Sequence, residues 1–257
     1  MDDELFVVDS GDGPAVVMLH GQPGTHEHLA AVASQLAGRA RTISVDRPGY
    51  GRSGGLTPES MAAQAERFAG LIRDRTAAPA IIVGHSFGGG IAILMAARQP
   101  ELVAGLVLVS SIGGKGSIAA ADRVLGLPLL GGPLSAASLA AYGMVAPFLA
   151  RLRLGSSLLG NVPTTPTTSL LDDRRTFLAE QRTLLAERRV IAEAIESIGC
   201  PTTVIQGTLD ALVPLEAGRD LVDRIAGARF VELEGVGHLV PRDAPSIITR
   251  SVLEMLG

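Results

Sequence analysis

The chain has 257 residues, of which 47% are hydrophobic and 19% charged, and its formal net charge is -4 at pH 7. This length fits one large domain with an insertion, and the composition is globular, which excludes a disordered or collagen-like chain. Because the charge balance is acidic and the arginines are scattered among acids, we expect no nucleic-acid partner.

Cysteine usage and the amino terminus bear on location. The single cysteine, Cys200, cannot form an internal disulfide, and the first four residues, Met-Asp-Asp-Glu, are acidic where a secretion signal is basic. We therefore expect a cytoplasmic location. Since Cys200 precedes Pro201 at the start of an apolar run, we interpret it as a packed thiol without chemistry.

Short runs rich in valine and isoleucine alternate with helical patterns along the chain. Continuous apolar runs of this length predict strands that are buried on both faces. These runs lie at residues 15–19, 42–45, 80–83, 106–109, 202–205 and 230–233. Helix-length patterns lie between them, at residues 25–36, 58–73, 88–98, 215–225 and 245–256. The alternation predicts an α/β fold with a mostly parallel central sheet and helices on both faces.

The alternation stops after Ile112 and resumes at Cys200. We therefore predict a core formed by residues 1–112 and 198–257 and an inserted helical cap at residues 113–197. Within the cap, residues 172–197 are strongly charged, with apolar positions recurring along one side, which predicts an amphipathic helix.

The first half of the predicted cap contains an uncharged stretch. No charged residue occurs between Arg123 and Arg151, which is long enough for a membrane span. Pro128, Pro133 and Pro147, together with several glycines, would break a spanning helix repeatedly, so we favour an apolar cap over a membrane span.

A candidate nucleophile follows the third predicted strand. The strand runs into Gly84-His85-Ser86-Phe87-Gly88, and a helical pattern begins immediately afterwards. A Gly-x-Ser-x-Gly sequence between a strand and a helix is typical of a nucleophile elbow, where the glycines relieve crowding at the serine. Ser86 is thus the predicted nucleophile, and a plain glycine-rich turn is the alternative.

A serine nucleophile needs a base and a group that orients the base. Of the five histidines, only His238 lies in a glycine-rich turn after the last predicted strand and away from the other motifs. In this fold the acid lies between serine and histidine in the chain, and Asp210 follows the strand at residues 202–205. We therefore predict His238 as general base and Asp210 as its partner; a solvated loop histidine and a turn-forming aspartate are the alternatives.

A tetrahedral intermediate needs two donors for its oxyanion. One is predicted to be the backbone N–H of Phe87, the residue after the nucleophile. The other should come from the loop after the first predicted strand, His20-Gly21-Gln22-Pro23-Gly24. Because Pro23 has no N–H, we assign this donor to Gln22.

These motifs, together with Asp46-Arg47-Pro48-Gly49-Tyr50-Gly51-Arg52-Ser53, resemble the α/β-hydrolase superfamily in order and spacing, over nearly the whole chain. The chain resembles its capped branch, which holds esterases, lactonases, carbon–carbon bond hydrolases, cofactor-free haloperoxidases, epoxide hydrolases and haloalkane dehalogenases. The last two groups use an aspartate nucleophile, so Ser86 favours acyl transfer. The resemblance makes the motif at Asp46 a structural turn, and we give Asp46 no catalytic role.

The expected substrate is a small, mainly apolar carboxylic ester or lactone, hydrolysed through an acyl-enzyme on Ser86. The candidate pocket residues are the cap side chains Leu139, Met144 and Phe148, which alternatively only pack the cap onto the core. Carbon–carbon bond hydrolysis and cofactor-free perhydrolysis use the same triad, and a ligand receptor that retains the triad is an alternative of another class. We expect no cofactor or metal, and the sequence does not predict the oligomeric state.

Overall fold

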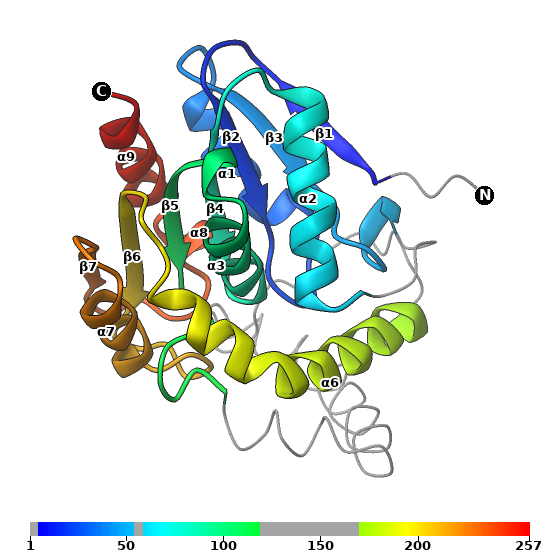
Figure 1. Ribbon diagram of the computed structural model, residues 1–257, viewed down its shortest axis with the longest axis vertical. Coiled ribbons are helices and arrows are strands. Elements are labelled where there is room, and N and C mark those ends of the chain that lie inside the picture. Colours follow the sequence, from blue (N-terminus) through cyan, green and yellow to red (C-terminus); the bar gives the residue numbers. More distant parts are fainter. Residues whose placement is uncertain (1–4, 54–58, 119–169) are drawn as a thin grey trace, which may run out of the picture.

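The computed structural model describes residues 5–53, 59–118 and 170–257, with side chains given from residue 174 onward in the last range (Figure 1). Its central feature is a seven-stranded sheet in the order β1-β3-β2-β4-β5-β6-β7. The strands are β1 (Val7–Ser10), β2 (Ala15–Leu19), β3 (Arg41–Val45), β4 (Ala80–His85), β5 (Val103–Val109), β6 (Thr202–Gly207) and β7 (Arg229–Leu233). Among the strands that the structure describes, only β1, at the edge, is antiparallel to its neighbour. The expected mostly parallel α/β fold is confirmed.

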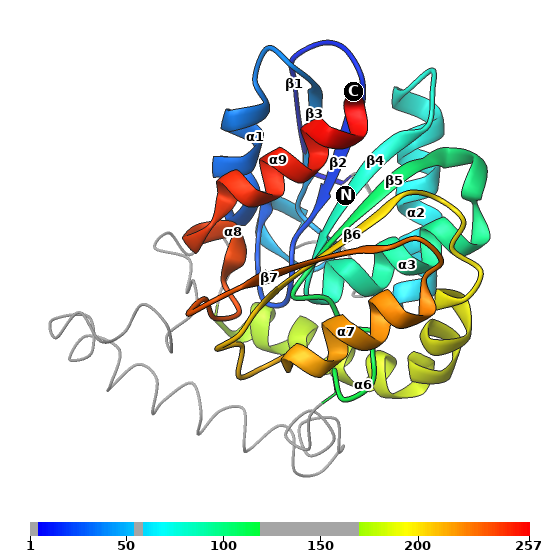
Figure 2. The same ribbon diagram turned by 90° about the vertical axis from the view of Figure 1, so that its left-hand side faces the viewer.

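The two faces of the sheet form two separate apolar cores. Side chains alternate between them along each strand, so that Val17 and Ile82 enter one core while Met18 and Val83 enter the other. Figure 2 shows the two helical layers on either side of the sheet. On one face lie α2 (Met61–Arg75), α3 (Phe87–Arg98) and α7 (Leu215–Arg224); on the other lie α1 (Ala30–Leu36), α8 (Val240–Asp243) and α9 (Pro245–Leu256). Short 3-10 turns occur at His26–Leu29, Gly51–Ser53 and Pro100–Leu102.

The long connection between β5 and β6 contains helix α6 (Leu170–Ile195), which crosses below α2 and α3 in Figure 1. Leu184, Ile191 and Ile195 of this helix are buried in the same core as α3. The carboxylate of Glu187 accepts hydrogen bonds from the backbone N–H groups of Met61 and Ala62, which lack partners within their own helix because they begin α2. The amphipathic helix expected at residues 172–197 is therefore present and is attached to the sheet layers by both apolar and polar contacts.

The remainder of the predicted cap lies at residues 119–169, outside the described residues, and so do the candidate pocket residues Leu139, Met144 and Phe148. Among the helices that the structure does describe, none is both long enough and apolar enough to span a membrane.

Candidate active site

Ser86 lies in the turn between β4 and α3, at the carboxyl edge of the sheet. Its backbone has φ 53° and ψ -116°, a left-handed conformation that is uncommon for a residue with a side chain. The chain reverses tightly around it: a Cβ added to Gly84 would lie 2.6 Å from the Gly88 carbonyl oxygen, and one added to Gly88 would lie 2.3 Å from that of Leu19. The two glycines of the predicted elbow are thus sterically required, and the serine is held on a sharp strand-to-helix turn.

Asp210 and His238 lie on neighbouring loops at the same edge of the sheet, after β6 and β7. The Nδ1 of His238 is 2.9 Å from Oδ2 and 3.1 Å from Oδ1 of Asp210. The carboxylate also accepts hydrogen bonds from Gln206 Nε2 and from the backbone N–H groups of Leu212 and Val213. Burial opposes ionisation, but the hydrogen bonds and charge of His238 and the backbone donors outweigh it and lower the pKa of Asp210. Asp210 is therefore an anion that orients the imidazole.

His238 is placed beside the turn that carries Ser86. The neighbouring side chain, His85, donates from Nε2 to the backbone carbonyl of His238 at 3.0 Å, and the two rings are 5.0 Å apart. Within the described part of the chain, no hydrogen bond joins Ser86 Oγ to His238. Such bonds are commonly long in substrate-free enzymes and tighten when the substrate binds.

The loop that contains Gln22 runs alongside the serine. A Cβ added to Gly21 would lie 3.0 Å from Ser86 Cβ, so the backbone of this loop approaches the nucleophile as closely as a glycine allows. Phe87 begins α3, and its ring is buried. The structure thus brings the loop that contains Gln22 next to Ser86, and Phe87, the other residue predicted to supply an oxyanion donor, directly follows Ser86 in the chain.

A buried ion pair beside this loop was not predicted from the sequence. Arg47 and Glu180 are both fully buried and form a salt bridge between the turn after β3 and helix α6. The sequence signal was present only in part: Arg47 belongs to the motif at residues 46–53, whereas Glu180 is one of many charged residues in the amphipathic helix predicted at residues 172–197. The two residues are 133 positions apart.

Asp46, in the same motif, has the structural part expected for it. Its carboxylate accepts hydrogen bonds from the backbone N–H of His26, from His26 Nδ1 and from the backbone N–H of Arg52. These bonds connect the 3-10 turn at His26–Leu29 to the turn after β3. Over the described ranges, no group of three or more histidine, cysteine or acidic side chains is arranged to hold a metal ion.

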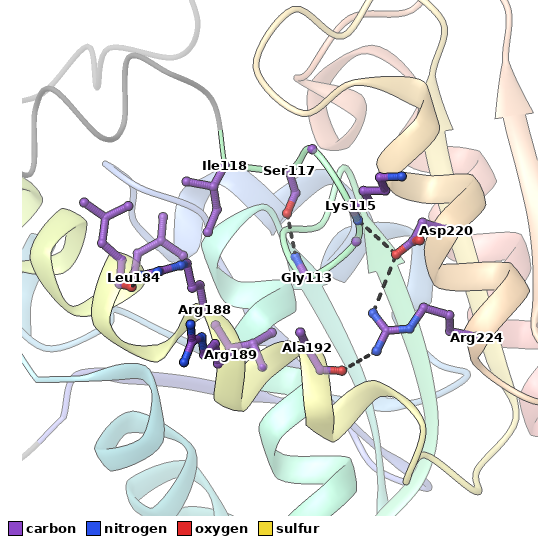
Figure 3. A pocket seen from close by; sticks show the side chains of 14 residues that line it. Gly113, Lys115, Ser117, Ile118, Leu184, Arg188, Arg189, Ala192, Asp220 and Arg224 are labelled. Carbon is purple, nitrogen blue, oxygen red and sulfur yellow. Dashed lines mark hydrogen bonds and ion pairs between the residues drawn. The ribbon is translucent and has the colours of Figure 1, made fainter.

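A cavity of about 850 Å³ lies between the loop at residues 113–118, α6 and α7 (Figure 3). Asp220 of α7 accepts from the backbone N–H of Lys115 and pairs with Arg224, which in turn donates to the Ala192 carbonyl of α6. None of the residues Ser86, Asp210 and His238 lines this cavity. It is therefore a separate feature of the junction between the insertion and α7.

Residues 16–248 match the model of the alpha/beta hydrolase family. The chain belongs to this family. It is 31% identical over 240 residues to the pimeloyl-[acyl-carrier protein] methyl ester esterase of Chromobacterium violaceum, and the match covers 91% of each chain.

Two solved structures show the same fold. A putative non-heme bromoperoxidase, BpoC of Mycobacterium tuberculosis, is 24% identical with a TM-score of 0.74, covering 98% of this chain and 95% of that one. A meta-cleavage product hydrolase, CumD of Pseudomonas fluorescens, is 24% identical with a TM-score of 0.70, covering 98% and 93%. These two likenesses show that the fold of this chain is shared with proteins named as a bromoperoxidase and as a hydrolase.

Proposed function

We propose that this family member is a serine hydrolase that cleaves a carboxylic ester or lactone through an acyl-enzyme on Ser86. The observation that carries the proposal is the Asp210–His238 pair, because an ionised carboxylate holds the imidazole by Nδ1 while His85 fixes the histidine backbone beside the serine turn. This arrangement leaves Nε2 of His238 as the base for the serine hydroxyl. The esterase named among the relatives agrees with this chemistry.

The proposed reaction has two halves. Ser86 Oγ attacks the ester carbonyl as His238 Nε2 takes its proton, and the tetrahedral oxyanion is stabilised by the backbone N–H groups of Gln22 and Phe87. The carbonyl re-forms, the bond to the alcohol breaks, and His238 gives its proton to the leaving oxygen. Water then attacks the acyl-enzyme with the same base and releases the acid. Asp210 stays ionised throughout and stabilises the imidazolium.

The substrate range is assigned to the insertion. Residues 113–197 are proposed to form the cap, with Leu139, Met144 and Phe148 lining the acyl pocket. Replacing Leu139 or Met144 by phenylalanine should then shorten the preferred acyl chain while leaving hydrolysis of an acetate ester nearly intact. An unchanged chain-length profile would restrict these side chains to packing.

The central test is labelling with a fluorophosphonate probe, together with turnover of p-nitrophenyl esters of rising chain length. Wild type and Ser86→Ala are compared with Ser110→Ala, a matched control because Ser110 also follows a strand and also has a positive φ, of 44°. We expect Ser86→Ala alone to lose labelling and to lower turnover by on the order of 10⁴ to 10⁶. Labelling that survives in Ser86→Ala would contradict the proposal.

The same assay separates the alternatives. A carbon–carbon bond hydrolase or a perhydrolase would be labelled at Ser86 but would hydrolyse esters poorly. The first would cleave vinylogous diketones well, and the second would form peracids well. A ligand receptor would be labelled without sustained turnover.

A further inference from the structure

The side chain of Arg47 is fully buried, and each of its five N–H bonds has an acceptor. The Nε group donates to the His20 carbonyl at 2.9 Å, and one NH2 proton donates to the Gly21 carbonyl at 3.1 Å. The remaining three donate to Gln64 Oε1 and to both carboxylate oxygens of Glu180. A guanidinium with every donor matched is fixed in position, because any rotation would leave a buried N–H without an acceptor.

Two of these acceptors, the carbonyls of His20 and Gly21, belong to the loop that contains Gln22. The carbonyl of Gly21 and the N–H of Gln22 are the two ends of one planar peptide unit and point in opposite directions. An arginine that holds the Gly21 oxygen therefore also sets the direction of the Gln22 N–H, one of the proposed oxyanion donors. His20 Nδ1 donates to the same oxygen at 2.7 Å, and the backbone N–H of Arg47 donates to His20 Nε2 at 2.9 Å.

The side chain of Phe87, whose backbone N–H is the second proposed donor, also contacts this guanidinium. The Arg47 carbon Cζ lies 4.7 Å from the centre of the Phe87 ring, at the start of α3. Arg47 thus touches the residue that precedes one donor and the side chain of the residue that supplies the other. Arg47 therefore contacts both segments that carry the proposed oxyanion donors.

The charge on Arg47 is neutralised by a residue of the insertion. Glu180 of α6 accepts from Arg47, from Gln64 Nε2 at 3.1 Å and from Tyr50 Oη at 2.8 Å. A buried guanidinium without its carboxylate would carry a large desolvation cost, so Glu180 keeps Arg47 in this site.

We propose that Arg47, held by Glu180 of α6, is a positioning residue that aims the Gln22 N–H at the reaction centre. The inference rests on the proposed function of Ser86. It adds that the geometry of the proposed oxyanion hole depends on Glu180, a residue of the insertion, as well as on the sheet layers.

The test compares Glu180→Gln with Glu187→Gln. Both replacements are isosteric and both remove a charged link between α6 and the sheet layers, but only Glu180 is joined to Arg47. We expect both to lower the melting temperature, whereas only Glu180→Gln lowers kcat, by about 10- to 100-fold with KM nearly unchanged, because a misaimed donor weakens binding of the transition state alone. Affinity for a boronic acid that mimics the tetrahedral intermediate should fall by the same factor, while a non-hydrolysed amide of the same acyl group binds as before.

A double variant, Arg47→Met with Glu180→Met, separates positioning from stability. Replacing a buried ion pair by apolar side chains of similar length commonly keeps a protein folded. A folded double variant with the reduced kcat and weakened boronate binding supports the proposal. A folded double variant with wild-type kcat, or equal kcat losses in Glu180→Gln and Glu187→Gln, overturns it. Failure of the proposed function would be seen separately, as absence of labelling at Ser86 in the wild-type protein.

Discussion

His85 donates a hydrogen bond from Nε2 to the backbone carbonyl of His238, 153 residues further along the chain. Since a carbonyl can only accept, the proton of the neutral ring lies on Nε2, and Nδ1 is a buried acceptor without a partner in the described residues. The residue next to the proposed nucleophile thus holds the backbone of the proposed base. Burial, with a smaller effect of the nearby His238, lowers the pKa of His85 to about 3, so the ring is neutral at pH 7.

Stability should depend on pH through His85. In the unfolded chain this ring takes up a proton near pH 6.5, whereas in the folded protein it does so only near 3. Between these values the unfolded state binds more protons, so the free energy of unfolding falls as the pH is lowered, by about 1.4 kcal/mol per pH unit. His85→Gln keeps a donor for the His238 carbonyl and removes this titration. Urea unfolding between about pH 4 and 6 gives the slope of the free energy of unfolding against pH. This slope should be smaller in the variant by the equivalent of one proton, and equal slopes would contradict the lowered pKa of His85.

Two aspartates with similar hydrogen bonds should differ in function. Asp210 and Asp46 each accept from a histidine Nδ1 and from two backbone N–H groups, but only Asp210 holds the proposed base. We expect Asp210→Asn to lower kcat by on the order of 10⁴, because an amide favours the wrong imidazole tautomer. Asp46→Asn should instead cost about 1–3 kcal/mol of stability and change kcat of the folded fraction only slightly. Similar kcat losses in the two variants would argue against Asp210 as the partner of the base.

Two helical glycines should respond to alanine in opposite directions. At Gly88 in α3 an added Cβ would lie 2.3 Å from the Leu19 carbonyl and 2.7 Å from the His20 carbonyl, whereas at Gly70 in α2 it would meet nothing within 4 Å. Gly88→Ala should destabilise by about 1–3 kcal/mol and disturb the serine turn. Gly70→Ala should stabilise by about 0.5–1 kcal/mol, because alanine loses less backbone entropy on folding. Chemical denaturation measures both, and a stable, active Gly88→Ala would refute the close packing.

Cys200 should react slowly as a thiol. Burial raises its pKa, although hydrogen bonding with Thr202 and with its own backbone opposes this. Since only the thiolate is nucleophilic, the rate of reaction with a disulfide reagent near pH 8 should be lower in the folded protein than after unfolding. Equal rates in the two states would show that the thiol is accessible and that folding does not raise its pKa.

The fold could be predicted from the sequence because the central strands are continuous apolar runs buried on both faces. Each of the six expected runs lies inside an observed strand. Strand β1 was missed, since it is four residues long, lies at the edge and alternates exposed positions with half-buried ones. The serine turn was recognisable because its sequence requirements are local, from Gly84 to Gly88.

The buried link to the insertion could not be predicted in the same way. Glu180 lies in a segment as charged as a solvent-exposed helix, and nothing local to it indicates that one carboxylate out of many is buried. Only the folded arrangement brings it to Arg47, across the sequence that separates β3 from α6. Pairings over such distances leave no periodicity in either segment.

The complete matching of the five Arg47 donors has a consequence for how this family diverges. A chance replacement of either Arg47 or Glu180 leaves an uncompensated buried charge, a change of several kcal/mol that a marginally stable protein tolerates poorly. The two positions should therefore change together during descent: relatives with an apolar residue at the position of Arg47 should also lack an acid at the position of Glu180. In a deep alignment this would appear as covariation between the turn after β3 and helix α6, stronger than for the exposed pair Arg219 and Glu232.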